Sequence, residues 1–210
     1  MPPAADAAEL LLLRHGQSTW NAEGRWQGQE DPPLSSLGEQ QAVDAAAHLR
    51  DARLSAVVSS TLQRARRTAE LIADALGLGE MVLEPRLVER NFGEFQGLTI
   101  TEILERWPDL FDAAGKLVAV PPGAEEVEAV VDRTLAALRD VASRAAGRRA
   151  LVVTHGGVIR RLDDSLGAAV PPTTPNLAGR WWTVDAAGAL VAGDVVVPVE
   201  PTIVTAPTTE

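Results

Sequence analysis

The chain has 210 residues and a net charge of -10, with 29 acidic against 19 basic residues. This length predicts one domain with a substantial core, and the acidic balance argues against a nucleic-acid partner. The absence of cysteine excludes disulfides, thiolate metal sites and cysteine nucleophiles.

Residues 1–9 are assigned to an N-terminal extension. They contain no basic region followed by a long apolar stretch, which is the pattern of a signal peptide. The apolar run at residues 10–13 is far too short to span a membrane. We therefore expect a cytoplasmic protein with no membrane partner.

Strand and helix patterns alternate along the chain. Short apolar runs predict strands at residues 10–13, 55–59, 81–83 and 150–153. Helices are predicted at residues 39–50, at 61–76 with Thr61 as cap and Gly77 at the stop, and from Glu125 onward. Such alternation implies a mainly parallel sheet covered by helices on both faces.

The remaining segments complete a single three-layer α/β/α domain, which we place at residues 10–197. Residues 180–197, with a turn at 185–188, predict a hairpin that adds an antiparallel edge to the sheet. Residues 99–123 have no clear period and are interpreted as a helical insertion over the active site. Residues 198–210, rich in Pro and Thr, are expected to form an extended tail.

Two of the three histidines have the same local context. His15 and His155 each follow an apolar strand and precede a glycine. In an open parallel sheet, ligands bind beyond the carboxyl ends of the strands, and glycine lets the backbone approach a ligand closely. These two histidines are therefore candidate functional residues, whereas His48, inside a helix pattern, is interpreted as an ordinary surface or core residue.

Two arginines are expected at the same edge. Arg14 precedes His15, and Arg64 lies one turn into the helix that follows the second strand. Together with the two histidines they predict a pocket for a dianion, because Arg can bind a phosphate with two parallel hydrogen bonds. Glu89, after the third strand, is a candidate for proton transfer. From spacing alone, a surface glutamate paired with Arg90 is an equally good interpretation.

Four sequence blocks follow one another along the chain: LLLLRHGQSTWNAEGRWQGQEDPPLSSLGEQQA, SSTLQRARRTAE, LVERNFGEFQGLT and VVTHGGVIR. In this order they resemble the blocks of the histidine phosphatase superfamily, the phosphoglycerate mutase-like proteins. The resemblance extends from residue 10 to about residue 176. The motif R-H-G alone is weak, but four ordered blocks in matching strand and helix contexts are specific.

The resemblance implies a role for each matching residue. His15 is the implied nucleophile, and Glu89 is the implied acid that protonates the leaving alkoxide and then helps to deprotonate water. The implied phosphate-binding and substrate-binding residues are Arg14, Asn21, Gln27, Gly28, Arg64, Arg90, His155 and Gly156, with Asn176 as a loose match at the pocket edge.

The physical chemistry of the step adds an expectation about His15. Nearby arginines should lower the pKa of His15, so that one ring nitrogen keeps a lone pair, and a hydrogen bond to the other nitrogen would select the tautomer. Fixed guanidinium and imidazole groups can supply positive charge for phosphoryl transfer, so no metal and no cofactor is expected.

The leading interpretation is a metal-independent phosphatase acting on a small phosphomonoester. The alternatives are a cofactor-dependent phosphoglycerate mutase and a non-catalytic phosphate-binding module. RWQGQEDPPLS resembles phosphatases, whereas Glu89-Arg90 and Gln96-Gly97-Leu98 resemble mutases. In mutases the Gln-Gly-Leu is often followed by Asn-Lys, whereas this chain has Thr99-Ile100. Mutases also place a pair of carboxylate-binding arginines in the insertion, whereas the insertion here contains Lys116 and no arginine pair.

Two further points stay open at this level. Asp163-Asp164 could suggest a cation site, but a solvated helix face is the better interpretation. The sequence does not name the substrate, and a homodimer is kept as an option.

Overall fold

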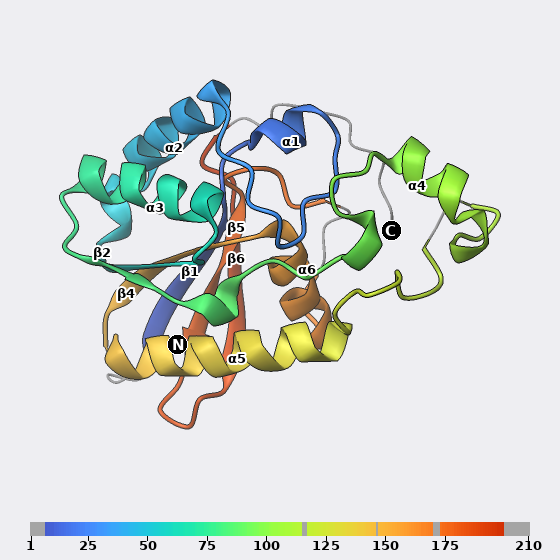
Figure 1. The fold of residues 1–210 in the computed structure, drawn as a ribbon. Coiled ribbons are helices and arrows are strands. Elements are labelled where there is room, and N and C mark those ends of the chain that lie inside the picture. The colour runs from blue at the N-terminus through green and yellow to red at the C-terminus, as the bar shows by residue number, and fades with distance from the viewer. Residues whose placement is uncertain (1–6, 115–116, 146, 170–172, 200–210) are drawn as a thin grey trace.

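The computed structural model describes residues 7–114, 117–145, 147–169 and 173–199. Lys116 and most of the expected tail lie outside these ranges. Within them, six strands form one sheet in the order β3-β2-β4-β1-β5-β6 (Figure 1). The strands are β1 (Ala8–Arg14), β2 (Leu54–Ser59), β3 (Met81–Leu83), β4 (Arg149–Thr154), β5 (Gly179–Val184) and β6 (Leu190–Val196).

The pairing within this sheet confirms the predicted fold class. Strands β1, β2, β3 and β4 are mutually parallel where they pair. The final hairpin adds β5 and β6 in antiparallel orientation beside β1. The molecule is therefore an α/β domain with a mainly parallel sheet and an antiparallel edge.

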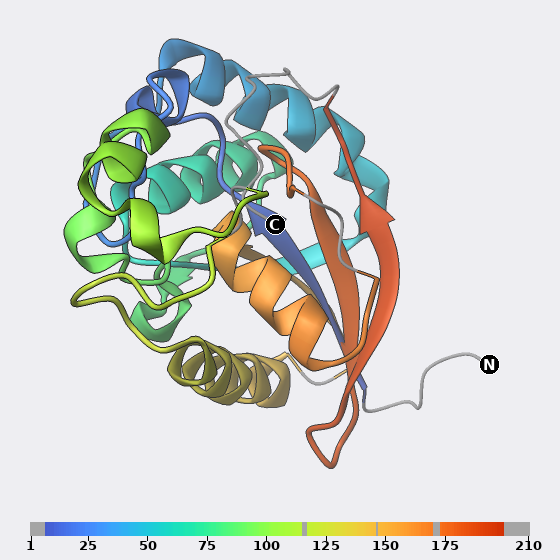
Figure 2. The same ribbon diagram turned by 90° about the vertical axis from the view of Figure 1, so that its right-hand side faces the viewer.

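Helices cover both faces of the sheet (Figures 1 and 2). One face packs against α2 (Ser36–His48) and α3 (Gln63–Leu76), and the other against α5 (Val127–Arg144) and α6 (Gly156–Ser165). The short helices α1 (Thr19–Ala22) and α4 (Ile100–Arg106) lie outside these layers. No helix in the described ranges is both long and apolar enough to cross a bilayer.

Strand β1 shows why the central strands are apolar at every position. Leu10 and Leu12 belong to the core under α5 and α6, and Leu11 and Leu13 to the core under α2 and α3. All four side chains are fully buried. A strand covered on both faces has no solvent side, so its sequence is a continuous apolar run rather than an alternation.

The ends of several elements differ from the sequence prediction. Strand β1 begins at Ala8, inside the stretch assigned to the extension, and α2 begins at Ser36, where the Ser35 side chain accepts from Gly38 N–H. Helix α3 begins at Gln63 rather than near Thr61, because Asp31 from a distant loop accepts the Gln63 N–H at 2.7 Å. Its predicted stop is confirmed, since Gly77 adopts a left-handed φ of 64°.

The insertion is organised around aromatic contacts, not around the sheet. Helix α4 opens with a capping box between Thr99 and Glu102. The Phe95 ring lies 5.3 Å from Trp107 and 6.3 Å from Phe111, measured between centroids. Because these aromatic residues pack on a loop cluster, their spacing follows no single helical or strand period.

One charged pair corrects the interpretation of the Asp163-Asp164 step. Asp163 is only 2% exposed, and its carboxylate lies 3.1 Å from Arg180 Nε, in an ion pair between α6 and β5. Burial raises the pKa of Asp163, and Arg180 opposes that rise. A solvated helix face is therefore wrong for Asp163, although Asp164 is exposed. His48 is exposed on α2.

Candidate active site

The two candidate histidines meet at the carboxyl edge of the sheet. Strands β1 and β4 are parallel neighbours in which Arg14 pairs with Thr154, so His15 and His155 leave the sheet side by side. Their ring centroids are 5.2 Å apart at an interplanar angle of 62°. The His15 N–H donates to the Thr154 carbonyl at 3.0 Å, which continues the ladder one residue beyond the strands.

The hydrogen bonds of His15 define its tautomer. Its Nδ1 lies 2.6 Å from the Gly16 carbonyl oxygen, which can only accept, so Nδ1 carries the proton. Arg64 Nε donates to His15 Nε2 at 3.3 Å, so Nε2 carries the lone pair. Because both contacts require the same tautomer, His15 presents an unprotonated nitrogen to the arginine side of the site.

Backbone carbonyls hold the two arginines in place. Arg64, 1% exposed, donates to the carbonyls of Gly28 at 2.8 Å and Glu30 at 2.7 Å. Arg14 donates to the Thr174 carbonyl at 2.5 Å. Its buried Nε has no hydrogen-bond partner within the described part of the chain. These contacts orient the guanidinium groups, and neutral carbonyls do not cancel their charge.

Burial and mutual repulsion shift the pKa values of these groups downward. Burial is the largest cause in each case, and it lowers the pKa of Arg14 and of Arg64 to about 10, although Glu89 opposes both shifts. The pKa of His15 falls well below 6.5, first through burial and then through the charges of Arg64 and Arg14. The expected direction is confirmed, with burial as a larger cause than the arginines.

Glu89 is positioned by two backbone donors. Its carboxylate accepts from the N–H of Arg90 at 2.8 Å and of Gly157 at 3.0 Å, and the residue is 8% exposed. A Cβ on Gly157 would lie 2.4 Å from Glu89 Oε1, so only glycine permits this contact. The Arg90 guanidinium instead donates to the Glu125 carbonyl at 2.7 Å. The alternative of a surface Glu89–Arg90 pair is therefore wrong.

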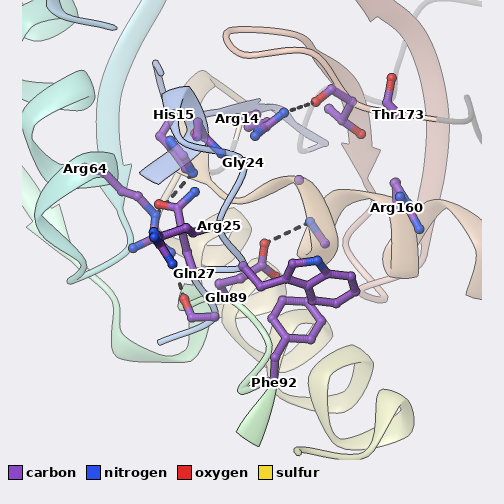
Figure 3. A pocket seen from close by; sticks show the side chains of 16 residues that line it. Arg14, His15, Gly24, Arg25, Gln27, Arg64, Glu89, Phe92, Arg160 and Thr173 are labelled. Atoms are coloured by element: carbon purple, nitrogen blue, oxygen red, sulfur yellow. Dashed lines mark hydrogen bonds between the residues drawn. The ribbon is translucent and has the colours of Figure 1, made fainter. Parts of the chain in front are cut away.

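Most predicted site residues line one cavity (Figure 3). Those on its wall are Arg14, His15, Asn21, Gln27, Gly28, Arg64, Glu89 and Gly156. Arg90 lines a neighbouring cavity. Asn176 does not line the first cavity; its side chain donates to the His15 carbonyl at 2.9 Å and so supports the His15 backbone.

His155 lies behind the cavity wall rather than on it. It is fully buried, and its Nε2 lies 2.8 Å from the Oγ of Ser60, the residue that follows β2. Its Nδ1 has no hydrogen-bond partner among the described residues. The burial of this ring, followed by the charge of Arg64, lowers the pKa of His155 well below 6.5.

The sequence analysis missed Arg160, which lines the cavity together with Thr173 and Thr174. Figure 3 places Arg160 on the side of the cavity opposite Arg64. A signal for it was present, because Arg160 lies one turn after Gly156 and so shares the face of α6 that begins at the sheet edge. The described residues contain no group of three or more His, Asp or Glu side chains arranged to hold a metal ion.

Comparison with known proteins shows the family of the chain. The model of the histidine phosphatase superfamily (branch 1) matches residues 10–176. The chain belongs to the histidine phosphatase superfamily. It is 40% identical over 162 residues to a metal-independent phosphoserine phosphatase of Arabidopsis thaliana, covering 75% of this chain and 68% of that protein. It is 39% identical over 151 residues to a probable phosphoglycerate mutase, GpmB, of Escherichia fergusonii, covering 70% and 69% respectively.

Solved structures of this superfamily also resemble the chain. Bacillus stearothermophilus YhfR has a TM-score of 0.78 and 31% identity, covering 88% of this chain and 95% of that chain. A mycobacterial glucosyl-3-phosphoglycerate phosphatase, solved with VO3, has a TM-score of 0.72 and 32% identity, covering 83% and 92%. The shared fold therefore includes more than four fifths of this chain and more than nine tenths of each solved chain.

The lowered pKa values of the two buried histidines predict a pH-dependent stability. Below about pH 6.5 the two histidines bind protons in the unfolded chain but stay neutral in the native protein. The free energy of unfolding should therefore fall as pH falls. Each histidine contributes a slope of at most about 1.4 kcal/mol per pH unit. Urea unfolding between pH 7.5 and 5 should show a flatter dependence for His15→Asn and His155→Asn than for wild type. The exposed His48→Asn serves as control, and parallel curves for all four proteins would contradict the prediction.

Proposed function

We propose that the protein is a metal-independent phosphatase that hydrolyses a small phosphomonoester through a phosphohistidine on His15. The observation that carries this proposal is the lone pair on His15 Nε2, held beside the Arg64 guanidinium by the Nδ1 contact with Gly16. A neutral nitrogen next to fixed cations can attack a phosphorus whose oxygens those cations bind. A covalent intermediate divides one difficult transfer into two easier steps.

In the first step, a bond forms between His15 Nε2 and phosphorus while the ester P–O bond breaks. Arg14 and Arg64 neutralise the phosphoryl oxygens, and protonated Glu89 gives its proton to the leaving oxygen. In the second step, Glu89 accepts a proton from water as the water oxygen attacks phosphorus. The N–P bond then breaks, which releases phosphate and returns the lone pair to Nε2.

Similarity to relatives supports the same reaction class. The relatives include proteins named as a phosphoserine phosphatase and as phosphoglycerate mutase-like. These names favour a phosphatase or mutase over a non-catalytic phosphate-binding module. The grouping of a nucleophile, two phosphate-binding cations and a carboxylate around one cavity also favours catalysis.

A mutase remains the second candidate because of one observation. Arg160 and Arg161 form an arginine pair on α6, beside the cavity, although the insertion contains no such pair. A mutase needs cations that hold both ends of its bisphosphorylated intermediate while the intermediate turns. The pair on α6 could serve one of these ends.

His15 should form the phosphoenzyme. His15→Ala removes the attacking nitrogen, so p-nitrophenyl phosphate turnover should fall at least about 1,000-fold. Rapid quench of the wild type with labelled substrate should trap a phosphoprotein that is labile in acid and stable in base. The exposed His48→Ala should retain full turnover. Near wild-type activity of His15→Ala would refute the assignment.

Glu89 should matter most for substrates with a poor leaving group. An alkyl alkoxide needs a proton to depart, whereas p-nitrophenolate departs unaided. Glu89→Gln should lower kcat/KM for an alkyl phosphate by about 100-fold or more, and for p-nitrophenyl phosphate by less than about 10-fold. Glu94→Gln, an exposed change in the same sequence block, is the control. An equal loss on both substrates would indicate a structural or binding role.

Water, rather than a second substrate hydroxyl, should receive the phosphoryl group. The described part of the insertion contributes Leu117, and no cation, to the neighbouring cavity. The arginines from other segments, Arg90, Arg160 and Arg161, can hold one further anionic group. The bisphosphoglycerate intermediate carries both a second phosphate and a carboxylate, so it should escape and leave the phosphohistidine open to water. With 3-phosphoglycerate and catalytic 2,3-bisphosphoglycerate, turnover should appear as free phosphate. Formation of 2-phosphoglycerate far above the rate of phosphate release would favour the mutase.

A further inference from the structure

A second cavity adjoins the candidate catalytic cavity. Both are bounded by Trp26, Glu89, Phe92, Gly157 and Arg160. The second cavity adds Arg90, Leu117 and Arg161. Arg160 therefore lies where the two cavities meet, on the side opposite Arg64 (Figure 3).

Three guanidinium groups line the second cavity, in a chain whose net charge is -10. Burial lowers the pKa of Arg90 and of Arg160, and in both cases the charge of Arg161 lowers it further. Arg161 is thus close enough to repel both of the other cations. A cluster of like charges in a cleft attracts a small counter-ion of opposite charge.

Four carboxylates lie near this cluster. Glu89 accepts from two backbone N–H groups, and Glu125 forms an ion pair with Arg133 at 2.8 Å. Glu126 and Asp164 are exposed. These four groups moderate the positive charge, but only Glu89 lies on the wall of the second cavity.

The remaining wall is apolar. Trp26 and Phe92 form an edge-to-face pair with centroids 4.8 Å apart, and Leu117 lies on the same cavity. A ligand that extends from the phosphate site toward Arg160 would place a short carbon segment against these side chains. The combination suits a small molecule with an anionic group at each end.

We propose that Arg160, with Arg161 and Arg90, binds a second anionic group of the substrate, so that the preferred substrates are short phosphomonoesters bearing a carboxylate or a further phosphate. This inference rests on the proposed function, which assigns the substrate phosphate to the cavity of Arg14 and Arg64. Arg160 is then a specificity-determining residue, supplied by the helix that follows His155 rather than by the insertion.

Non-hydrolysable phosphonates test this inference by isothermal titration calorimetry. Wild type should bind 2-carboxyethylphosphonate or propane-1,3-bisphosphonate at least about 10-fold more tightly than propylphosphonate, which lacks the second anion. Of the two ligands with a second anionic group, the one that binds more tightly identifies that group as carboxylate or phosphonate. Equal affinity for all three compounds, or no binding of any, would overturn the proposal.

Variants assign the preference to residues. Arg160→Gln and Arg161→Gln should each reduce the preference severalfold. In Arg161→Gln, whose residue lines only the second cavity, propylphosphonate affinity should also stay within about twofold. Arg139→Gln, which removes an exposed charge on α5, is the matched control and should keep the full preference. A preference unchanged in both Arg160→Gln and Arg161→Gln would overturn the assignment.

The same measurements separate this inference from the proposed function. If the protein prefers the two-anion phosphonates but hydrolyses no phosphomonoester, the second anion site is supported and the phosphatase proposal is refuted. If the protein hydrolyses p-nitrophenyl phosphate but shows no preference among the phosphonates, the phosphatase proposal is supported and the second anion site is refuted.

Discussion

Buried positive charge at the carboxyl edge of the sheet is the constraint on which the site depends. Transfer of a guanidinium out of water is costly unless its N–H groups find acceptors. Arg14 and Arg64 find them in the carbonyls of Thr174, Gly28 and Glu30, although Arg14 Nε has no acceptor among the described residues. Carbonyls satisfy hydrogen bonds without neutralising charge, whereas carboxylate partners would have filled the same positions with negative charge. The site therefore keeps an excess of positive charge that an anionic ligand can use.

This arrangement also explains the glycines around the site. A carbonyl can reach a buried side chain only where its own segment approaches closely, and a Cβ obstructs that approach. At Gly28, which has a left-handed φ of 53°, a Cβ would lie 2.1 Å from Gln96 Oε1. At Gly157 it would collide with Glu89, the group assigned to proton transfer. The backbone of these loops thus holds the two arginines and the Glu89 carboxylate in fixed relative positions, as the strands do for the two histidines.

Sequence reasoning succeeded where one local pattern decides the structure. The apolar run that ends at His15 predicted a central strand because both faces of β1 are covered. It failed where a distant residue decides. Asp31 accepts the first N–H of α3 from 32 residues away, and Arg180 of β5 forms the ion pair of the buried Asp163. Arg160 was missed for another reason: cations for a second anion were sought in the insertion, although the one-turn spacing that identified Arg64 applies equally to α6.

The contrast between an acidic chain and a cationic pocket bears on which anions reach His15. Negative charge over the rest of the molecule repels large polyanions, whose many charges sample the whole surface. A small ester samples mainly the field at the cavity mouth, where Arg14, Arg64 and Arg160 line the wall. We therefore propose that the net charge selects against nucleic acid, while the local cluster selects for a compact anion. Because both effects act on the substrate before any contact forms, discrimination by size and charge precedes the stereochemical fit within the two cavities.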